Sequence, residues 1–160
     1  MVLKLAERIL QDSDTFYIKE ASLKEAQELR SIFRSVFSED WSPMIGRKFI
    51  LVAVEKQSNK VIGGIQRVVD IDSASAKGDA LAVLPEFRNK GVGSSLLKVM
   101  DAELKKMGVR EVNTVPGDED AWDFFRKRGY NYETSVREGL RLQNKDENEY
   151  LPSFRLVKRL

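Results

Sequence analysis

The chain has 160 residues, 42% hydrophobic and 32% charged, which suffices for one buried core and is too short for two ordinary domains. It has no cysteine and no histidine, which excludes disulfides, thiol nucleophiles and Ser-His-Asp catalysis and removes the ligands of most zinc sites. The net charge of +2 does not by itself indicate a nucleic-acid partner. No apolar run approaches the roughly 20 residues that span a bilayer, so we expect no membrane partner. The lack of cysteine gives no sign of an oxidising compartment, so we expect a cytoplasmic protein, and we expect no bound metal.

The N-terminal segment, residues 1–11, has apolar residues at roughly helical spacing and lacks the features of a signal peptide. We therefore expect a helical extension over residues 1–14, packed on the domain or used as an oligomer contact, and one domain over residues 15–160. The oligomeric state is expected to be a monomer or a homodimer. A first strand is predicted at Phe16–Lys19, followed by a helix that begins with a capping box of Ser22 and Glu25.

The middle of the chain predicts strands separated by turns. A loop over residues 38–47 contains Trp41, which together with Phe37 is a candidate wall of an acceptor pocket, although a Trp packed on the core is an equal alternative. Residues 49–55 and 61–69 form a predicted hairpin, and two adjacent glycines in the second strand, Gly63 and Gly64, indicate a bulge or a close backbone approach. Another strand is expected over residues 76–84.

The most informative stretch is residues 81–107. Four apolar residues end at Pro85, as at the end of a buried strand, and a helix with one apolar face then runs to Gly108. The first turn of that helix contains no Asp or Glu; it reads Gly91, Val92, Gly93, Ser94, Ser95 and follows Arg88, Asn89 and Lys90. Unpaired N–H groups, glycines and nearby cations suit a phosphate or pyrophosphate, so residues 91–95 predict an anion cradle. The alternative is a tight turn that uses glycine only for close packing.

Other phosphate-binding motifs do not fit. The chain has no Gly-x-x-x-x-Gly-Lys-Ser/Thr sequence, which makes a P-loop unlikely on spacing alone. A dinucleotide fingerprint starting at Gly91 fails because Leu96 occupies its third glycine position.

The C-terminal part predicts a short strand over residues 110–115, a helix capped by Asp118 and stopped by Gly129, and a final hairpin. The hairpin is expected to pair residues 130–142 with residues 154–160. The complete order predicts an α/β (α+β) fold with a mixed, mostly antiparallel sheet and helices on both faces.

Two segments resemble one known family. Residues 81–97, with Arg88, Gly91 and Gly93 in the pattern Gln/Arg-x-x-Gly-x-Gly/Ala, resemble the acyl-CoA signature of the GNAT acyltransferase superfamily. Residues 118–130 are similar to that family's Asn-x-x-Ala-x-x-Phe-Tyr-x-x-x-Gly-Phe segment. The order of elements from about Phe16 onwards also resembles the family.

The resemblance implies an N-acetyltransferase that moves acetyl from acetyl-CoA directly to an amine. It implies that strand backbone at Leu81, Ala82 and Val83 contacts the pantetheine arm, and that residues 88–95, Asp118 and Phe125 contribute to the acyl-CoA site. Asp79, the carboxylate closest to the signature, is the candidate base, with a solvated strand-edge charge as the alternative. The partners expected are acetyl-CoA and an amine acceptor of unspecified identity.

The sequence departs from the family at two positions. Phe125 stands where many members have the Tyr that protonates the CoA thiolate, and Asp118 replaces Asn. One rival function is therefore a catalytically silent acyl-CoA-binding or regulatory domain. The other rival is a nucleic-acid-binding module that uses the basic residues Arg126, Lys127, Arg128, Arg155, Lys158 and Arg159, for which solvated element ends are the more ordinary explanation.

Overall fold

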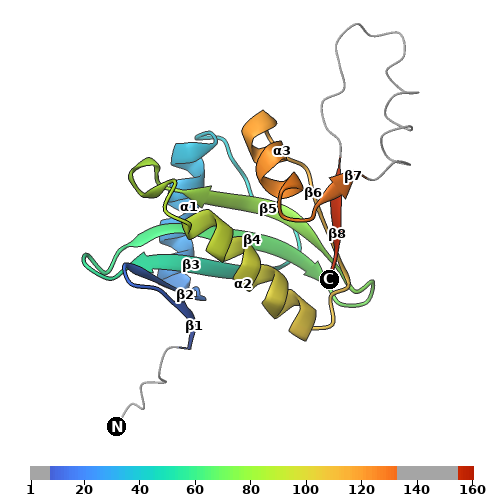
Figure 1. The fold of residues 1–160 in the computed structure, drawn as a ribbon, viewed down its shortest axis with the longest axis horizontal. Helices are drawn as coiled ribbons and strands as arrows, with labels where there is room; N and C mark the ends of the chain where they lie inside the picture. Colours follow the sequence, from blue (N-terminus) through green and yellow to red (C-terminus); the bar gives the residue numbers. More distant parts are fainter. Residues whose placement is uncertain (1–7, 133–154) are drawn as a thin grey trace, which may run out of the picture.

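The computed structural model describes residues 8–132 and 155–160. Within these residues, eight strands form one sheet in the order β1-β2-β3-β4-β5-β6-β8-β7 (Figure 1). The strands are β1 (Ile9–Asp12), β2 (Phe16–Glu20), β3 (Arg47–Glu55), β4 (Val61–Asp70), β5 (Ser75–Val83), β6 (Glu111–Thr114), β7 (Asn131–Tyr132) and β8 (Leu156–Arg159). The helices are α1 (Leu23–Val36), α2 (Val92–Lys106) and α3 (Glu119–Arg126), with a 3-10 turn, η1, at Pro85–Phe87.

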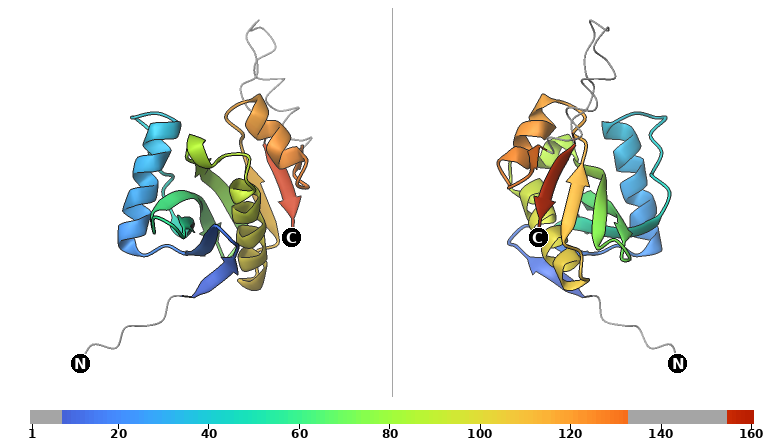
Figure 2. Two further views of the ribbon diagram at one scale, coloured as in Figure 1. Left: turned by 60° about the vertical axis from the view of Figure 1, so that its left-hand side comes forward. Right: turned by 90° about the vertical axis from the view of Figure 1, so that its right-hand side faces the viewer.

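The sheet lies between two helical layers. Figure 2 shows α1 on one side of the sheet and α2 with α3 on the other. All neighbouring strands are antiparallel except β5 and β6, which are parallel and joined through α2. This arrangement confirms the predicted fold class, a mostly antiparallel mixed sheet with helices on both faces.

The N-terminal extension differs from the prediction. The described part, Ile9–Asp12, is a strand that pairs antiparallel with β2, so the helix predicted there is wrong for these residues. Residues 1–7, the rest of that predicted helix, lie outside the described residues. The pairing uses the otherwise open outer edge of β2, and Leu10 packs against the core. Tertiary pairing at a sheet edge overrides the weak helical spacing of so short a segment.

Several local predictions are confirmed. Ser22 and Glu25 form the capping box of α1, with the Ser22 N–H donating to Glu25 Oε1 at 2.9 Å and the Glu25 N–H donating to Ser22 Oγ at 3.2 Å. The loop between β3 and β4 forms a hairpin, and β7 pairs with β8 as the described part of the final hairpin. Residues 133–154 of that hairpin lie outside the described residues. Gly108 and Gly129 have φ values of +92° and +94°, as expected where helices stop.

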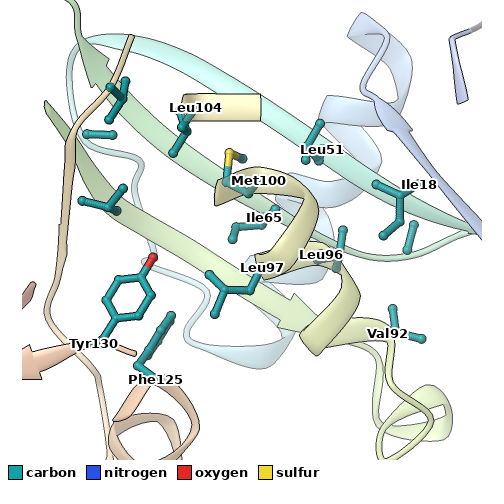
Figure 3. Packing of buried hydrophobic residues seen from close by; sticks show 14 of the residues in the cluster. Ile18, Leu51, Ile65, Val92, Leu96, Leu97, Met100, Leu104, Phe125 and Tyr130 are labelled. Carbon is teal, nitrogen blue, oxygen red and sulfur yellow. The ribbon is translucent and has the colours of Figure 1, made fainter. Parts of the chain in front are cut away.

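Two hydrophobic clusters fill the two faces of the sheet. The first lies under α2 and α3 and contains Leu96, Leu97, Met100, Phe125 and Tyr130, which Figure 3 shows facing the strands from both helices and from the segment after α3. The second lies under α1 and includes Leu29 and Phe33 packed on β3, β4 and β5. The β5 side chains alternate between these clusters, with Leu81 in the first and Ala80 and Ala82 in the second.

Gly63 and Gly64 allow the close approach that the sequence predicted. A Cβ on Gly63 would lie 2.7 Å from the Ala82 carbonyl oxygen, and one on Gly64 would lie 2.5 Å from Leu29 Cδ2. The pairing of β3 with β4 also shifts register between Ala53 and Val54, next to these glycines. Both explanations, a bulge and a close approach, therefore hold, and they bring β5 and α1 tightly onto β4.

Candidate functional site

The C-terminal half of β5 has an open edge. β5 pairs with β6 only from Ser75 to Lys77 among the described residues, whereas its pairing with β4 continues to Val83. The two parallel strands thus form a fork that opens after Lys77. In the part of the chain that the structure describes, no strand pairs with the open side of residues 78–83, so this edge can bind an extended chain that carries amide groups. The predicted contacts Leu81, Ala82 and Val83 all lie on this edge.

A bulge lies at the start of the fork. Gln66 pairs with Ala80 and Arg67 pairs with Gly78, so Asp79 is the extra residue in β5. Such a bulge bends a strand and ends regular pairing, which is consistent with the separation of β5 from β6 at this point. The side chain of Asp79, the candidate base, lies outside the described part of the structure, and its role stays a prediction.

The N-terminus of α2 lies next to the end of β5. Its N-cap is Gly91, which has a φ of +83° and makes no side-chain cap, and the first turn has no acidic residue. The first hydrogen bond of α2 runs from the Ser95 N–H to the Gly91 carbonyl, at 3.0 Å. Within the predicted cradle, the N–H groups of Val92, Gly93 and Ser94 precede this bond and so have no acceptor inside the helix. A Cβ on Gly91 would meet nothing within 4 Å, so the space in front of this turn is open. The geometry suits an anion.

The basic residues before α2 make contacts within the protein. Arg88 Nε donates to the Val83 carbonyl oxygen at 2.9 Å, which ties the loop to the end of β5 and holds the guanidinium close to the cradle. Lys90 Nζ lies 5.7 Å from the centroid of the Phe87 ring. Between them Asn89 adopts a φ of +61°, a left-handed conformation that Asn tolerates better than most residues.

A further cation, Arg128, reaches the cradle, and the sequence did not single it out for this role. Its Nε donates to Ser94 Oγ at 3.2 Å, its Nη1 donates to the Phe124 carbonyl at 2.9 Å, and its Cζ lies 3.9 Å from the centroid of the Phe124 ring. Arg128 therefore joins the end of α3 to the first turn of α2. No sequence signal identifies this contact, because 34 positions separate the two residues.

The helix α3 closes the other side of the fork. Asp118 accepts a hydrogen bond from the Ala121 N–H at 2.8 Å, so it caps α3 as predicted, and the structure gives it this structural role. Phe125 is buried and packs edge-on against Tyr130, with ring centroids 5.2 Å apart. Phe124 faces Gly93, where a Cβ would lie 3.9 Å from the Phe124 ring.

A buried polar group lies behind Phe125. Arg67 on β4 is only 1% exposed, and its Cζ lies 5.9 Å from the centroid of the Phe125 ring. Nearby, the Tyr130 hydroxyl donates to Asp101 Oδ1 at 3.0 Å, and Lys158 Nζ lies 2.9 Å from Asp101 Oδ2. Burial raises the pKa of Tyr130 well above its ordinary value, the charge of Arg67 lowers it in part, and Asp101 raises it further. Tyr130 is therefore a neutral hydrogen-bond donor at physiological pH.

The candidate acceptor side lies on the opposite face of the sheet. Trp41 packs 4.9 Å from Phe33, and Phe37 lies 5.9 Å from Phe33 and 6.5 Å from Trp41, measured between ring centroids. Phe33 and Trp41 belong to the cluster that includes Ala80 and Ala82 of β5, while Phe37 is 47% exposed. The structure thus brings Phe37 and Trp41 together at the face of β5 that points away from α2.

Several further observations limit the possible functions. In the part of the chain that the structure describes, no helix is long and apolar enough to cross a membrane, and no group of three or more acidic side chains could hold a metal ion.

Three residues of the proposed basic nucleic-acid surface have internal partners: Arg126 donates to Asn131, Arg128 to Ser94 and Lys158 to Asp101. A hollow of about 540 Å³ lies at the far end of β5, lined by residues 44–47 and by the β4–β5 turn, away from the cradle.

Comparisons with known proteins agree with this geometry. Residues 46–132 match the family model described as an acetyltransferase (GNAT) domain, a segment that is more than half of the chain and that includes β3 to β7, the fork and the cradle. The chain belongs to the GNAT acetyltransferase family. A comparison with curated proteins gave no match.

Solved structures of GNAT proteins share the fold. A GNAT-family acetyltransferase from Staphylococcus aureus is 15% identical, with 91% of this chain and 99% of that chain covered and a TM-score of 0.65. The PaiA N-acetyltransferase of Thermoplasma acidophilum, solved with coenzyme A, is 16% identical, with 91% and 99% covered and a TM-score of 0.65. An aminoglycoside 6′-N-acetyltransferase, also solved with coenzyme A, is 13% identical, with 89% and 96% covered and a TM-score of 0.66.

Proposed function

We propose that this GNAT protein is an N-acetyltransferase that moves an acetyl group from acetyl-CoA to a primary amine on a small molecule or a protein. The observation that carries the proposal is the N-terminus of α2, which has a left-handed glycine as N-cap, no acidic residue in its first turn and open space in front of it. These features suit a pyrophosphate and would be unfavourable as a plain helix start, because the positive end of the helix dipole has no counter-charge.

The chain offers a set of groups that fit the acyl donor. The N–H groups of Val92, Gly93 and Ser94 would hold phosphate oxygens, and the free part of the Arg88 guanidinium and Arg128 would add positive charge beside them. The open edge of residues 81–83 would pair with the amide groups of an extended arm. When bound, acetyl-CoA supplies an activated acetyl thioester.

The residues available favour direct transfer to the amine. With no cysteine or histidine in the chain, the simplest route needs no covalent enzyme intermediate and depends on aligning the amine with the thioester. In this proposal a strand N–H near the Asp79 bulge would polarise the carbonyl, and Asp79 is our candidate to accept a proton from the amine, directly or through water. Phe37 and Trp41 are our candidates for the wall that contacts the acceptor.

A silent acyl-CoA-binding domain is the alternative, and Phe125 motivates it because a phenyl ring cannot donate a proton to a leaving thiolate. A thiol-release assay with acetyl-CoA and a panel of amines separates the two functions. An enzyme releases CoA only when its acceptor is present, and mass spectrometry then finds the acetylated amine. A binder has measurable affinity for CoA and releases none with any amine, and Gly93→Glu provides the control for release that does not depend on the cradle.

A further inference from the structure

Arg67 has a buried charge that no carboxylate among the described residues neutralises. The residue is 1% exposed, and its Nε and Nη2 have no hydrogen-bond partner in the structure. A buried guanidinium is normally paired and fully hydrogen-bonded, because its desolvation is costly. Nε and Nη2 of Arg67 are therefore donors that a ligand entering the site could use.

The charges around Arg67 do not balance. Asp101 is the acidic group of this cluster, and its two oxygens accept from Tyr130 and Lys158 at 3.0 Å and 2.9 Å. Tyr130 is neutral, so the described cluster of Arg67, Lys158, Asp101 and Tyr130 carries one excess positive charge. The charge of Lys158 compensates that of Asp101, which leaves the charge of Arg67 available to an incoming anion.

The guanidinium of Arg67 lies at the apex of the fork. Arg67 pairs with Gly78, the first β5 residue after the pairing with β6 ends. Its Nη1 lies 3.1 Å from the position that a Cβ on Gly78 would take, and that Cβ would also clash with Thr114 of β6. Glycine at residue 78 therefore lets β5, Thr114 of β6 and the Arg67 guanidinium approach one another closely. The open edge of β5 leads from the cradle towards this point.

Phe125 faces the same guanidinium. Its ring centroid lies 5.9 Å from Arg67 Cζ. By the resemblance of residues 118–130 to the family segment, Phe125 stands where many members have a Tyr. The place where a hydroxyl is missing is thus close to a cation that bonds to the Tyr130 hydroxyl and has two further N–H groups, on Nε and Nη2, without a partner in the described part of the chain. The lost hydroxyl at Phe125 and the buried charge of Arg67 are therefore considered together.

We infer that Arg67 is a catalytic residue whose guanidinium stabilises the thiolate that leaves during acetyl transfer, in place of the proton that a Tyr would donate. This inference rests on the proposed function. The amine nitrogen bonds to the carbonyl carbon, the carbon–sulfur bond breaks, and the sulfur leaves with the bonding electron pair. The amine proton passes to a base or to water. Arg67 remains protonated throughout, because arginine does not lose its proton in proteins, and water protonates the thiolate after release.

The test measures the pKa of the CoA thiol in the complex. An opposite charge within hydrogen-bond distance lowers a pKa by about 1 to 3 units from an ordinary thiol value of about 8.5. The ultraviolet absorbance of the thiolate is followed during a pH titration of wild-type protein with CoA, and the complex with desulfo-CoA serves as the baseline that removes tyrosine absorbance. We expect the bound thiol in the wild type to titrate at least one unit lower than free CoA.

Three variants complete the test. Arg67→Met fills a similar volume without charge and should return the thiol pKa to that of free CoA, whereas Arg67→Lys should retain part of the shift. The matched control is Arg30→Met, the same chemical change on the exposed side of α1, which should leave the shift intact. An unshifted thiol in the wild-type complex overturns the role of Arg67, even if Arg67→Met does not fold. A shift that persists in folded Arg67→Met overturns it as well. A wild type that does not bind CoA at all contradicts the proposed function instead.

Discussion

Gly93→Glu should make the free protein more stable and at the same time abolish CoA binding. Gly93 lies in the first turn of α2 with room for a side chain, since its Cβ would have ordinary contacts of 3.6 Å with Val83 and 3.9 Å with Phe124. Replacing a helical glycine contributes about 0.8 to 1 kcal/mol, and a carboxylate near a helix N-terminus adds roughly 0.3 to 1 kcal/mol. The melting temperature should rise by about 2 to 4 °C per kcal/mol.

Binding should change in the opposite direction. A carboxylate about 4 Å from a phosphate costs on the order of 4 kcal/mol at an effective dielectric constant of 20, or roughly a thousandfold in Kd. Solvent screening at the rim of the site reduces this figure, so a loss of at least about a hundredfold is the expected result by isothermal titration calorimetry.

The control is Gly93→Ala, which adds helix propensity without charge and corresponds to the alanine that the family signature accepts at this position. It should stabilise the protein and retain CoA affinity. If Gly93→Glu folds, melts higher than the wild type and binds CoA with unchanged Kd, then the first turn of α2 does not hold the pyrophosphate.

Three other changes test separate parts of the structure. Arg88→Ala should weaken CoA by about 1 to 3 kcal/mol and weaken fragments without the pyrophosphate much less; an equal loss for both by calorimetry would make Arg88 structural. Tyr130→Phe removes the buried bond to Asp101 and should cost about 1.5 to 3 kcal/mol in urea denaturation, whereas Tyr17→Phe, which loses an exposed 3.4 Å contact to Asn59, should cost little; similar losses would refute the assignment. Although burial raises the pKa of Glu25, the Lys19 ammonium at 2.7 Å and the bonds to Ser22 hold that pKa below its ordinary value of 4.5, so this stabilisation is present above pH 4.5 and decreases as the pH falls through the folded-state pKa. Glu25→Gln should therefore destabilise the protein more at pH 7 than at low pH, and an equal deficit at both would contradict this.

Local signals in the sequence predicted much of the fold. The Ser22 and Glu25 capping box, the turn before β4 and the glycines that stop α2 and α3 depend on interactions within a few residues, and all were predicted correctly. The glycines of residues 81–97 and the lack of acidic residues there are also local features, and on them the sequence predicted the start of α2 and the candidate anion cradle. The family match bears out the resemblance on which that identification depended.

Features that depend on distant pairing could not be predicted. Ile9–Asp12 is a strand because β2 offers an edge, and no residue in the segment encodes that edge. Arg128 meets Ser94 only after α3 packs beside α2. No local pattern singles out Arg67, because the β5 bulge, the neighbouring Gly78 and the ring of Phe125 come together around it only in three dimensions.

A crystal structure of the protein with CoA would show directly where the cofactor binds. We expect pyrophosphate oxygens within hydrogen-bond distance of the N–H groups of Val92, Gly93 and Ser94, an extended pantetheine arm along residues 81–83 of β5, and the sulfur at the fork beside Arg67. CoA bound at any other surface, or a first turn of α2 that contacts only solvent in the complex, would contradict this expectation.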